Sequence, residues 1–117
     1  DTLQQAEASM TQYIAKLATI EGVEVASRSL ARFSPVEFSP DVMNLIETTA
    51  NERGYACQRL PSGAGHDAQM FAPNCPTGMI FVPSQGGISH NVKEFTAAAE
   101  IDAGLDVLTQ VVLQLTE

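Results

Sequence analysis

Two short segments of this sequence combine glycines with polar side chains that could take part in chemistry. Residues 61–68 read Pro-Ser-Gly-Ala-Gly-His-Asp-Ala, and residues 79–90 run from an apolar stretch through a glycine pair to a histidine. Small residues let a backbone approach a ligand closely, and the amides of Gly65, His66 and Asp67 would open a following helix, whose positive end favours an anion. The same pattern also fits an ordinary strand-to-helix turn in which Asp67 satisfies first-turn amides.

Metal-binding side chains are scarce in the chain. Its two histidines, His66 and His90, lack the short helical spacing of a two-histidine metal motif. A closed zinc site would also have to recruit Cys57 and Cys75, whose scattered positions are not typical of such sites. The residues alone therefore predict no metal centre completed within this chain, and we expect both cysteines to be free thiols.

Composition and charge narrow the classes of partner. The 117 residues include 14 acidic and 6 basic side chains, which gives a formal net charge of −8. Such a chain offers no basic patch to neutralise a phosphate backbone, so we expect neither nucleic acid nor an anionic membrane as a partner. The longest apolar run, at residues 79–83, is far shorter than the roughly 20 residues needed to cross a bilayer. We therefore expect a soluble, cytoplasmic protein.

The elements that would position the two motifs divide into two groups. Apolar residues recur at helical spacing over residues 2–21 and alternate with polar residues over 23–33, which predicts a helix followed by a strand. Two Ser-Pro steps in residues 34–40 disfavour regular structure and indicate a linker. We place a boundary there, with one domain at 1–37 and another at 38–117. Because the first helix begins at the start of the sequence, with no strand or loop before it, we expect this chain to be a piece of a longer protein.

The second group alternates helices with strands. Ser39 as N-cap and Pro40 at the first helical position predict a helix that ends at Gly54. The other expected elements are strands at 55–60 and 78–82, a short helix at 66–72 and a long helix from about residue 97 to the end. This order is half of an open α/β sandwich with a mostly parallel sheet. Its unpaired edge would need a missing segment or a partner chain, so we expect self-association.

The two glycine motifs, with Glu94, Phe95 and Thr96 after the second, resemble the C-terminal part of the hydantoinase/carbamoylase amidases. That family includes N-carbamoyl-L-amino acid hydrolases, allantoate amidohydrolases and β-ureidopropionases, and it is related to dinuclear metal aminopeptidases. The resemblance implies an open α/β sandwich of the phosphorylase/hydrolase-like aminopeptidase type for residues 38–117. It implies that residues 1–37 end an inserted lid and dimerisation domain, and hence that the parent protein is a homodimer.

The resemblance also assigns roles to particular residues. His90 corresponds to the family's last metal ligand, in a site for two divalent ions that are commonly zinc, manganese, cobalt or nickel. The segment lining the pocket for a small ureido or amide substrate corresponds to Gly63, Gly65, His66 and Asp67. In the family reaction the metals activate a water that attacks the carbamoyl or ureido carbon, and a glutamate takes the proton. The family's catalytic glutamates and its His-x-Asp pair are absent, so we expect no catalytic residue within this chain.

Three hypotheses about function stay open on these grounds. The first is a part, inactive in isolation, of a metal-dependent amidohydrolase that cleaves a C–N bond in N-carbamoyl amino acids, allantoate or related linear ureido compounds. The second is a non-catalytic module that uses the apolar stripe of its first helix to dimerise or to bind a partner, although such stripes are more often core. The third is one half of a split enzyme whose other half is a separate chain.

Overall fold

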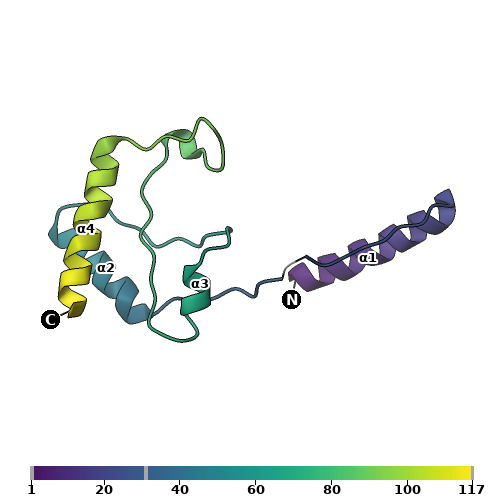
Figure 1. The fold of residues 1–117 in the computed structure, drawn as a ribbon, viewed down its shortest axis with the longest axis horizontal. Coiled ribbons are helices and arrows are strands. Elements are labelled where there is room, and N and C mark those ends of the chain that lie inside the picture. The colour runs from purple at the N-terminus through teal and green to yellow at the C-terminus, as the bar shows by residue number, and fades with distance from the viewer. Residues whose placement is uncertain (1, 31, 117) are drawn as a thin grey trace. The chain divides into compact units, whose positions relative to one another are not determined.

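The computed structural model describes residues 2–30 and 32–116. It contains the helices α1 (Thr2–Glu21), α2 (Pro40–Glu52), α3 (Ala68–Phe71) and α4 (Ala98–Thr116), and a 3-10 turn, η1 (Gln85–Gly87) (Figure 1). The chain divides into two compact units, Asp1–Phe33 and Ser34–Glu117. None of the helices in the described ranges is long and apolar enough to cross a membrane. The predicted identities of residues 1–37 and 38–117 as lid and catalytic domains stay predictions.

The first unit is a helix with an extended return segment. Helix α1 has the predicted bounds, and its end is marked by Gly22, which adopts a φ of 66°. The chain then runs back beside the helix (Figure 1), where Arg32 forms an ion pair with Glu7. No strand forms in the described residues between 23 and 33, so the strand predicted there is wrong. A strand needs a neighbouring strand for its backbone hydrogen bonds, and α1 cannot supply them.

Helix α2 begins and ends where its local sequence predicts. The Ser39 hydroxyl accepts a hydrogen bond of 3.5 Å from the backbone N–H of Val42, and Pro40 occupies the first turn. At the other end Gly54 adopts a φ of 82° and donates its N–H to the carbonyl of Asn51. Both ends are therefore set by residues within one turn of the helix, which is why the sequence alone predicts them.

The core of the second unit lies between α2 and α4, which pack against each other (Figure 1). Ala50 from α2 meets Val107 and Val111 from α4, and each keeps 5% or less of its surface exposed. The buried hydroxyl of Thr49 accepts a hydrogen bond of 3.2 Å from the Gln114 side chain. A small apolar contact and one satisfied polar pair thus join the two helices.

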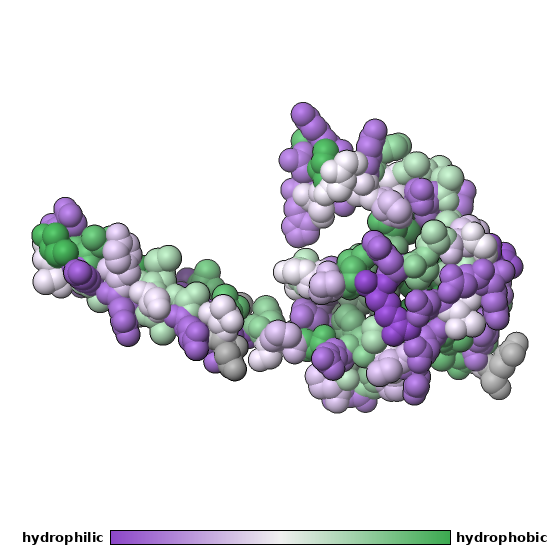
Figure 2. Space-filling view, turned by 180° about the vertical axis from the view of Figure 1, so that it is seen from behind, coloured by the Kyte–Doolittle hydropathy of each residue, from purple (hydrophilic) through white to green (hydrophobic). Residues whose placement is uncertain are grey.

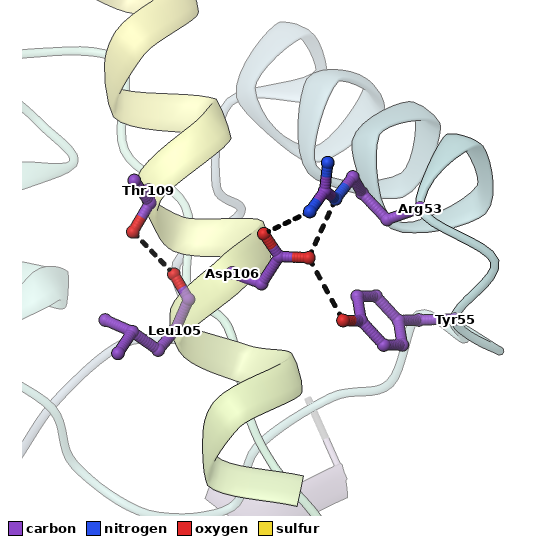
Figure 3. Close-up of polar contacts among 5 residues, drawn as sticks. All are labelled: Arg53, Tyr55, Leu105, Asp106 and Thr109. Atoms are coloured by element: carbon purple, nitrogen blue, oxygen red, sulfur yellow. Dashed lines mark hydrogen bonds and ion pairs between the residues drawn. The ribbon is translucent and has the colours of Figure 1, made fainter. Parts of the chain in front are cut away.

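A polar cluster joins the end of α2 to the middle of α4 (Figure 3). Arg53 donates two hydrogen bonds of 2.7 Å to the two carboxylate oxygens of Asp106, and the Tyr55 hydroxyl donates a third of 3.0 Å. The hydrogen bond from Arg53 lowers the pKa of Asp106, and hydrogen bonding to Asp106 raises the pKa of Arg53 and of Tyr55. Beside the cluster Thr109 donates to the Leu105 carbonyl at 2.8 Å, a contact internal to α4.

The predicted strands at 55–60 and 78–82 are also absent from the described part of the chain, so the open α/β sandwich is not confirmed. Residues 78–82 nevertheless pack on the helices. A Cβ added at Gly78 would lie 2.7 Å from Cγ1 of Val42 in α2, and one added at Gly104 in α4 would lie 2.5 Å from Cγ1 of Val82. The segment therefore covers both helices as a strand would, but no second strand pairs with it.

Candidate functional site

The 61–67 loop is organised around its histidine. The Oγ atom of Ser62 lies 2.8 Å from Nε2 of His66, and the same oxygen accepts the Ala64 N–H at 3.3 Å. The backbone N–H of His66 donates to the Gln69 side-chain oxygen at 3.0 Å. The loop thereby brings a serine and a histidine four residues apart into contact.

The helix that follows this loop is shorter than predicted. The sequence predicts residues 66–72, whereas α3 spans Ala68–Phe71. Asp67 lies at its N-cap but makes no side-chain capping hydrogen bond, and the N–H of His66 is already taken by Gln69. One turn of helix carries little dipole, so the predicted attraction of an anion to a helix N-terminus is not supported by this geometry.

The other predicted residues of the loop differ in their surroundings. Gly63 has open space where a side chain would start, and the Cβ position of Gly65 would lie 3.8 Å from the Gln69 side-chain oxygen. Both glycines are exposed, and so is Asp67, whereas His66 is half-buried. The loop thus presents an open backbone at its glycines, beside an imidazole that the fold holds in place.

An aromatic contact joins the two motifs. The His66 ring packs edge-on against Phe81, with ring centroids 5.5 Å apart and an angle of 64° between the planes. Phe81 belongs to the 78–82 segment that leads into the second glycine loop. Edge-to-face packing is a favoured arrangement of aromatic rings. The structure therefore places the 61–67 loop against the base of the second motif.

The second loop closes on itself through hydrogen bonds to its own backbone carbonyls. The Ser84 hydroxyl donates to the Ile88 carbonyl at 2.5 Å, and the Gln85 N–H donates to the Phe95 carbonyl at 2.8 Å. Gly86 and Gly87 have φ angles of 65° and 67°, which favour glycine. A shallow pocket of about 280 Å³ lies at the foot of the loop and is lined by Pro83, Ser84, Gln85, Phe95, Ala97 and Glu100.

His90 stands at the exposed end of this loop. It adopts a φ of 55°, a left-handed conformation that is uncommon for a residue with a side chain, and its N–H donates to the Glu94 carboxylate at 2.9 Å. Among residues 2–30 and 32–116, no hydrogen bond or ion pair joins His90 to the 61–67 loop. The structure therefore brings His66 and the glycines of that loop together and leaves His90 on a separate loop.

The donor atoms around His90 do not fit a complete metal site. In the described ranges, no three histidine, cysteine, aspartate or glutamate side chains gather closely enough to hold an ion. Zinc sites use three or four protein ligands, and one exposed imidazole can fill only one of those positions. Cys57 and Cys75 are both exposed and unpaired. No chemical step can be derived from a metal held by these residues alone.

Sequence reasoning missed three residues that shape the site. Ser62 and Gln69 fix the side chain and the backbone of His66, and Phe81 supports its ring. The four-residue spacing of Ser62 and His66, and the three-residue spacing of His66 and Gln69, were the local signals available. The contact with Phe81 had no local signal in the sequence, because the two residues are 15 positions apart and only the fold brings their rings together.

Comparison with known proteins places the chain in a group of hydrolases. The model of peptidase family M20/M25/M40 matches residues 6–114. An allantoate amidohydrolase from Bacillus subtilis is 35% identical over 97% of this chain, which spans 27% of that protein. An N-carbamoyl-L-amino-acid amidohydrolase from Rhizobium meliloti is 40% identical over 82% of this chain and 23% of its own length.

A solved structure of an amidase is also similar to this chain. The amidase of the hydantoinase/carbamoylase family from Burkholderia vietnamiensis superposes with a TM-score of 0.92 at 34% identity, over 96% of this chain and 27% of the other. The chain spans about a quarter of the length of each of these proteins. On the strength of the family match over nearly all of its residues, the chain belongs to peptidase family M20/M25/M40.

Proposed function

We propose that this chain is the C-terminal part of a metal-dependent amidohydrolase that cleaves a C–N bond in N-carbamoyl amino acids, allantoate or a related linear ureido compound. The observation that carries the proposal is that both glycine loops, with every predicted site residue, lie inside residues 6–114, the segment matched by the family model. The relatives named for allantoate and N-carbamoyl amino acids support the substrate class.

The proposal gives each loop one task. His90 supplies one ligand of a two-ion site, and Glu94 holds its backbone so that the imidazole stays on the exposed side of the loop. The M20 family is generally dependent on two metal ions, and we expect zinc, manganese, cobalt or nickel here. When bound, such ions supply an activated water for hydrolysis. Gly63, Gly65, His66 and Asp67 line the substrate pocket.

The remaining groups come from polypeptide outside these residues. We propose that the other metal ligands and the proton-accepting glutamate come from there, together with the strands that pair with residues 78–82. Residues 1–37 would then end the lid and dimerisation domain of a cytoplasmic homodimer. The packing of 78–82 across α2 and α4 supports the pairing of this segment with strands from outside, because a segment covered by helices on one face and unpaired at its edges is suited to join a sheet.

A chimeric enzyme tests the proposal directly. We would replace the matching segment of the B. subtilis allantoate amidohydrolase with this chain and assay allantoate hydrolysis and bound metal. We expect the chimera to be active, and His90→Ala to lower kcat/KM by more than about 100-fold, because even groups that only orient a metal ligand are worth roughly 10- to 100-fold. The bound metal per subunit should fall as well.

The matched control is Lys93→Ala, which removes an exposed side chain three residues away in the same loop. It should leave both metal content and kcat/KM unchanged. A His90→Ala chimera that keeps its metal and its activity would refute the role of His90. An inactive wild-type chimera with native-like unfolding would refute the proposed function itself.

The isolated chain offers a second test. Because it carries one matched ligand, we expect it to bind divalent metal weakly and to hydrolyse neither allantoate nor an N-carbamoyl amino acid. Turnover by the purified chain would show that its own residues complete a site. Isothermal titration with zinc and manganese measures the metal binding, and a colorimetric ammonia assay measures the hydrolysis.

A further inference from the structure

The Ser62 hydroxyl lies between two hydrogen-bonding groups, the backbone N–H of Ala64 and the His66 ring. The Ala64 N–H can only donate, so Oγ of Ser62 accepts from it. The serine proton is then available for the other neighbour, Nε2 of His66, 2.8 Å away. Oγ of Ser62 also keeps a second lone pair that can accept from Nε2–H, so the contact by itself fits both tautomers; where the serine donates, Nε2 carries no proton of its own and the ring proton of a neutral His66 lies on Nδ1.

Two further contacts hold His66 in this arrangement. Phe81 packs edge-on against the ring, and Gln69 accepts the backbone N–H of His66. The residue is half-buried, so its ring has less freedom than an exposed one. Among the described residues, the hydrogen bond to the imidazole is made at Nε2, which leaves Nδ1 for a ligand.

We propose that Ser62 is a positioning residue that holds His66 in its Nδ1–H tautomer, so that His66 offers an uncharged N–H donor to a carbonyl or carboxylate oxygen of the substrate. The second half of this inference rests on the proposed function, whereas the serine–histidine pairing does not. An uncharged donor suits a ureido oxygen, because that oxygen is itself uncharged and does not need a cation as its partner.

Nitrogen-15 NMR of the full 117-residue chain tests the tautomer. The chain has two histidines, so its ring spectrum contains two spin systems, and His90 serves as an internal control. At a pH of about 8, where imidazoles are ordinarily neutral, we expect His66 to show a protonated Nδ1 and an unprotonated Nε2. Ser62→Ala should shift His66 toward the other tautomer, Ser62→Thr should restore the original signature, and His90 should not respond.

The chimeric enzyme tests the donor. An asparagine amide nitrogen reproduces the position of Nδ1, and a glutamine amide nitrogen that of Nε2. His66→Asn should therefore keep at least about 10-fold more kcat/KM than His66→Gln, the size of one uncharged hydrogen bond. Ser62→Ala should lose about 10-fold and Ser62→Thr should recover it. The control variant Thr48→Ala, which removes an exposed hydroxyl from α2, should leave kcat/KM unchanged.

The outcomes test the positioning role of Ser62, the donor role of His66 and the proposed function separately. A protonated Nε2 in the wild-type chain, or a His66 spectrum that Ser62→Ala leaves unchanged, overturns the positioning role of Ser62. Equal activity of His66→Asn and His66→Gln, or greater activity of the glutamine variant, overturns the donor role of Nδ1. If the wild-type chimera is inactive while the NMR signature is as expected, the proposed function fails and the serine–histidine pairing stands.

Discussion

Helices α1 and α4 are nearly the same length, 20 and 19 residues, yet they differ in how their apolar residues are used. Helix α4 buries Val107 and Val111 against α2, whereas α1 has no buried residue. Both sequences show apolar residues at helical spacing. The comparison shows that periodicity predicts a helix and its apolar face, but not whether that face has a partner.

The two units also differ in the contacts that hold them. The second unit has an apolar core and the Arg53–Asp106–Tyr55 cluster (Figure 3), in which carboxylate, guanidinium and phenol satisfy one another. In the first unit, apolar side chains lie at the surface (Figure 2), among them Leu3, Met10, Tyr13, Leu17 and Ile20. Substitutions in the second unit should therefore change the free energy of unfolding more than those in the first.

The largest effect is expected in the α2–α4 core. Val107→Ala should lower the free energy of unfolding by about 2 kcal/mol, because it leaves a cavity beside Ala50. The matched control is Val112→Ala on the same helix, where the residue is 49% exposed and the cost should stay below about 0.5 kcal/mol. Urea unfolding followed by circular dichroism measures both, and equal costs would contradict the assigned core.

A glycine substitution tests the packing of residues 78–82 on α2. Gly78→Ala should cost about 1.5 kcal/mol, because the new methyl group would lie 2.7 Å from a stiff valine side chain and force it to move. Gly63→Ala has open space around it and should be close to neutral. If the two alanine variants unfolded at the same urea concentration, residues 78–82 would not be packed on the helix as described.

Acid should weaken the polar cluster of the second unit. The folded-state pKa of Asp106 is lowered below its ordinary value of 3.8, so its contribution to stability is present above about pH 4 and is lost as the pH falls through the folded-state pKa. Asp106→Asn should therefore be less stable than the wild type at pH 6, and this difference should shrink at pH 2. Asp102→Asn, one turn away in α4, is the control. A difference that does not change with pH would exclude the ionised carboxylate as its source.

The smallest effect on unfolding is expected in α1. Tyr13→Ala changes a residue that is 58% exposed and should alter the free energy of unfolding by less than about 0.5 kcal/mol. If the exposed residues of α1 meet a second copy, the same change should lower the weight-average mass measured by light scattering at high concentration. A monodisperse wild-type monomer would refute the predicted self-association.

Local sequence signals predicted the helices well and the strands badly. Ser39, Pro40 and Gly54 act on groups within one helical turn, so α2 was predicted almost to the residue. The alternation at 23–33 and the apolar run at 78–82 predict strands only where another strand lies alongside. In the described residues no such neighbour exists, and the segments remain without regular secondary structure.

The sequence by itself determined the family, the helices and the two glycine loops, because each depends on residue types at short spacing. Only the tertiary structure decided that Phe81 supports His66 and that α2 packs against α4. These arrangements depend on contacts between residues far apart in the chain. Such contacts are selected by packing and hydrogen bonding across the whole unit, which no local pattern records.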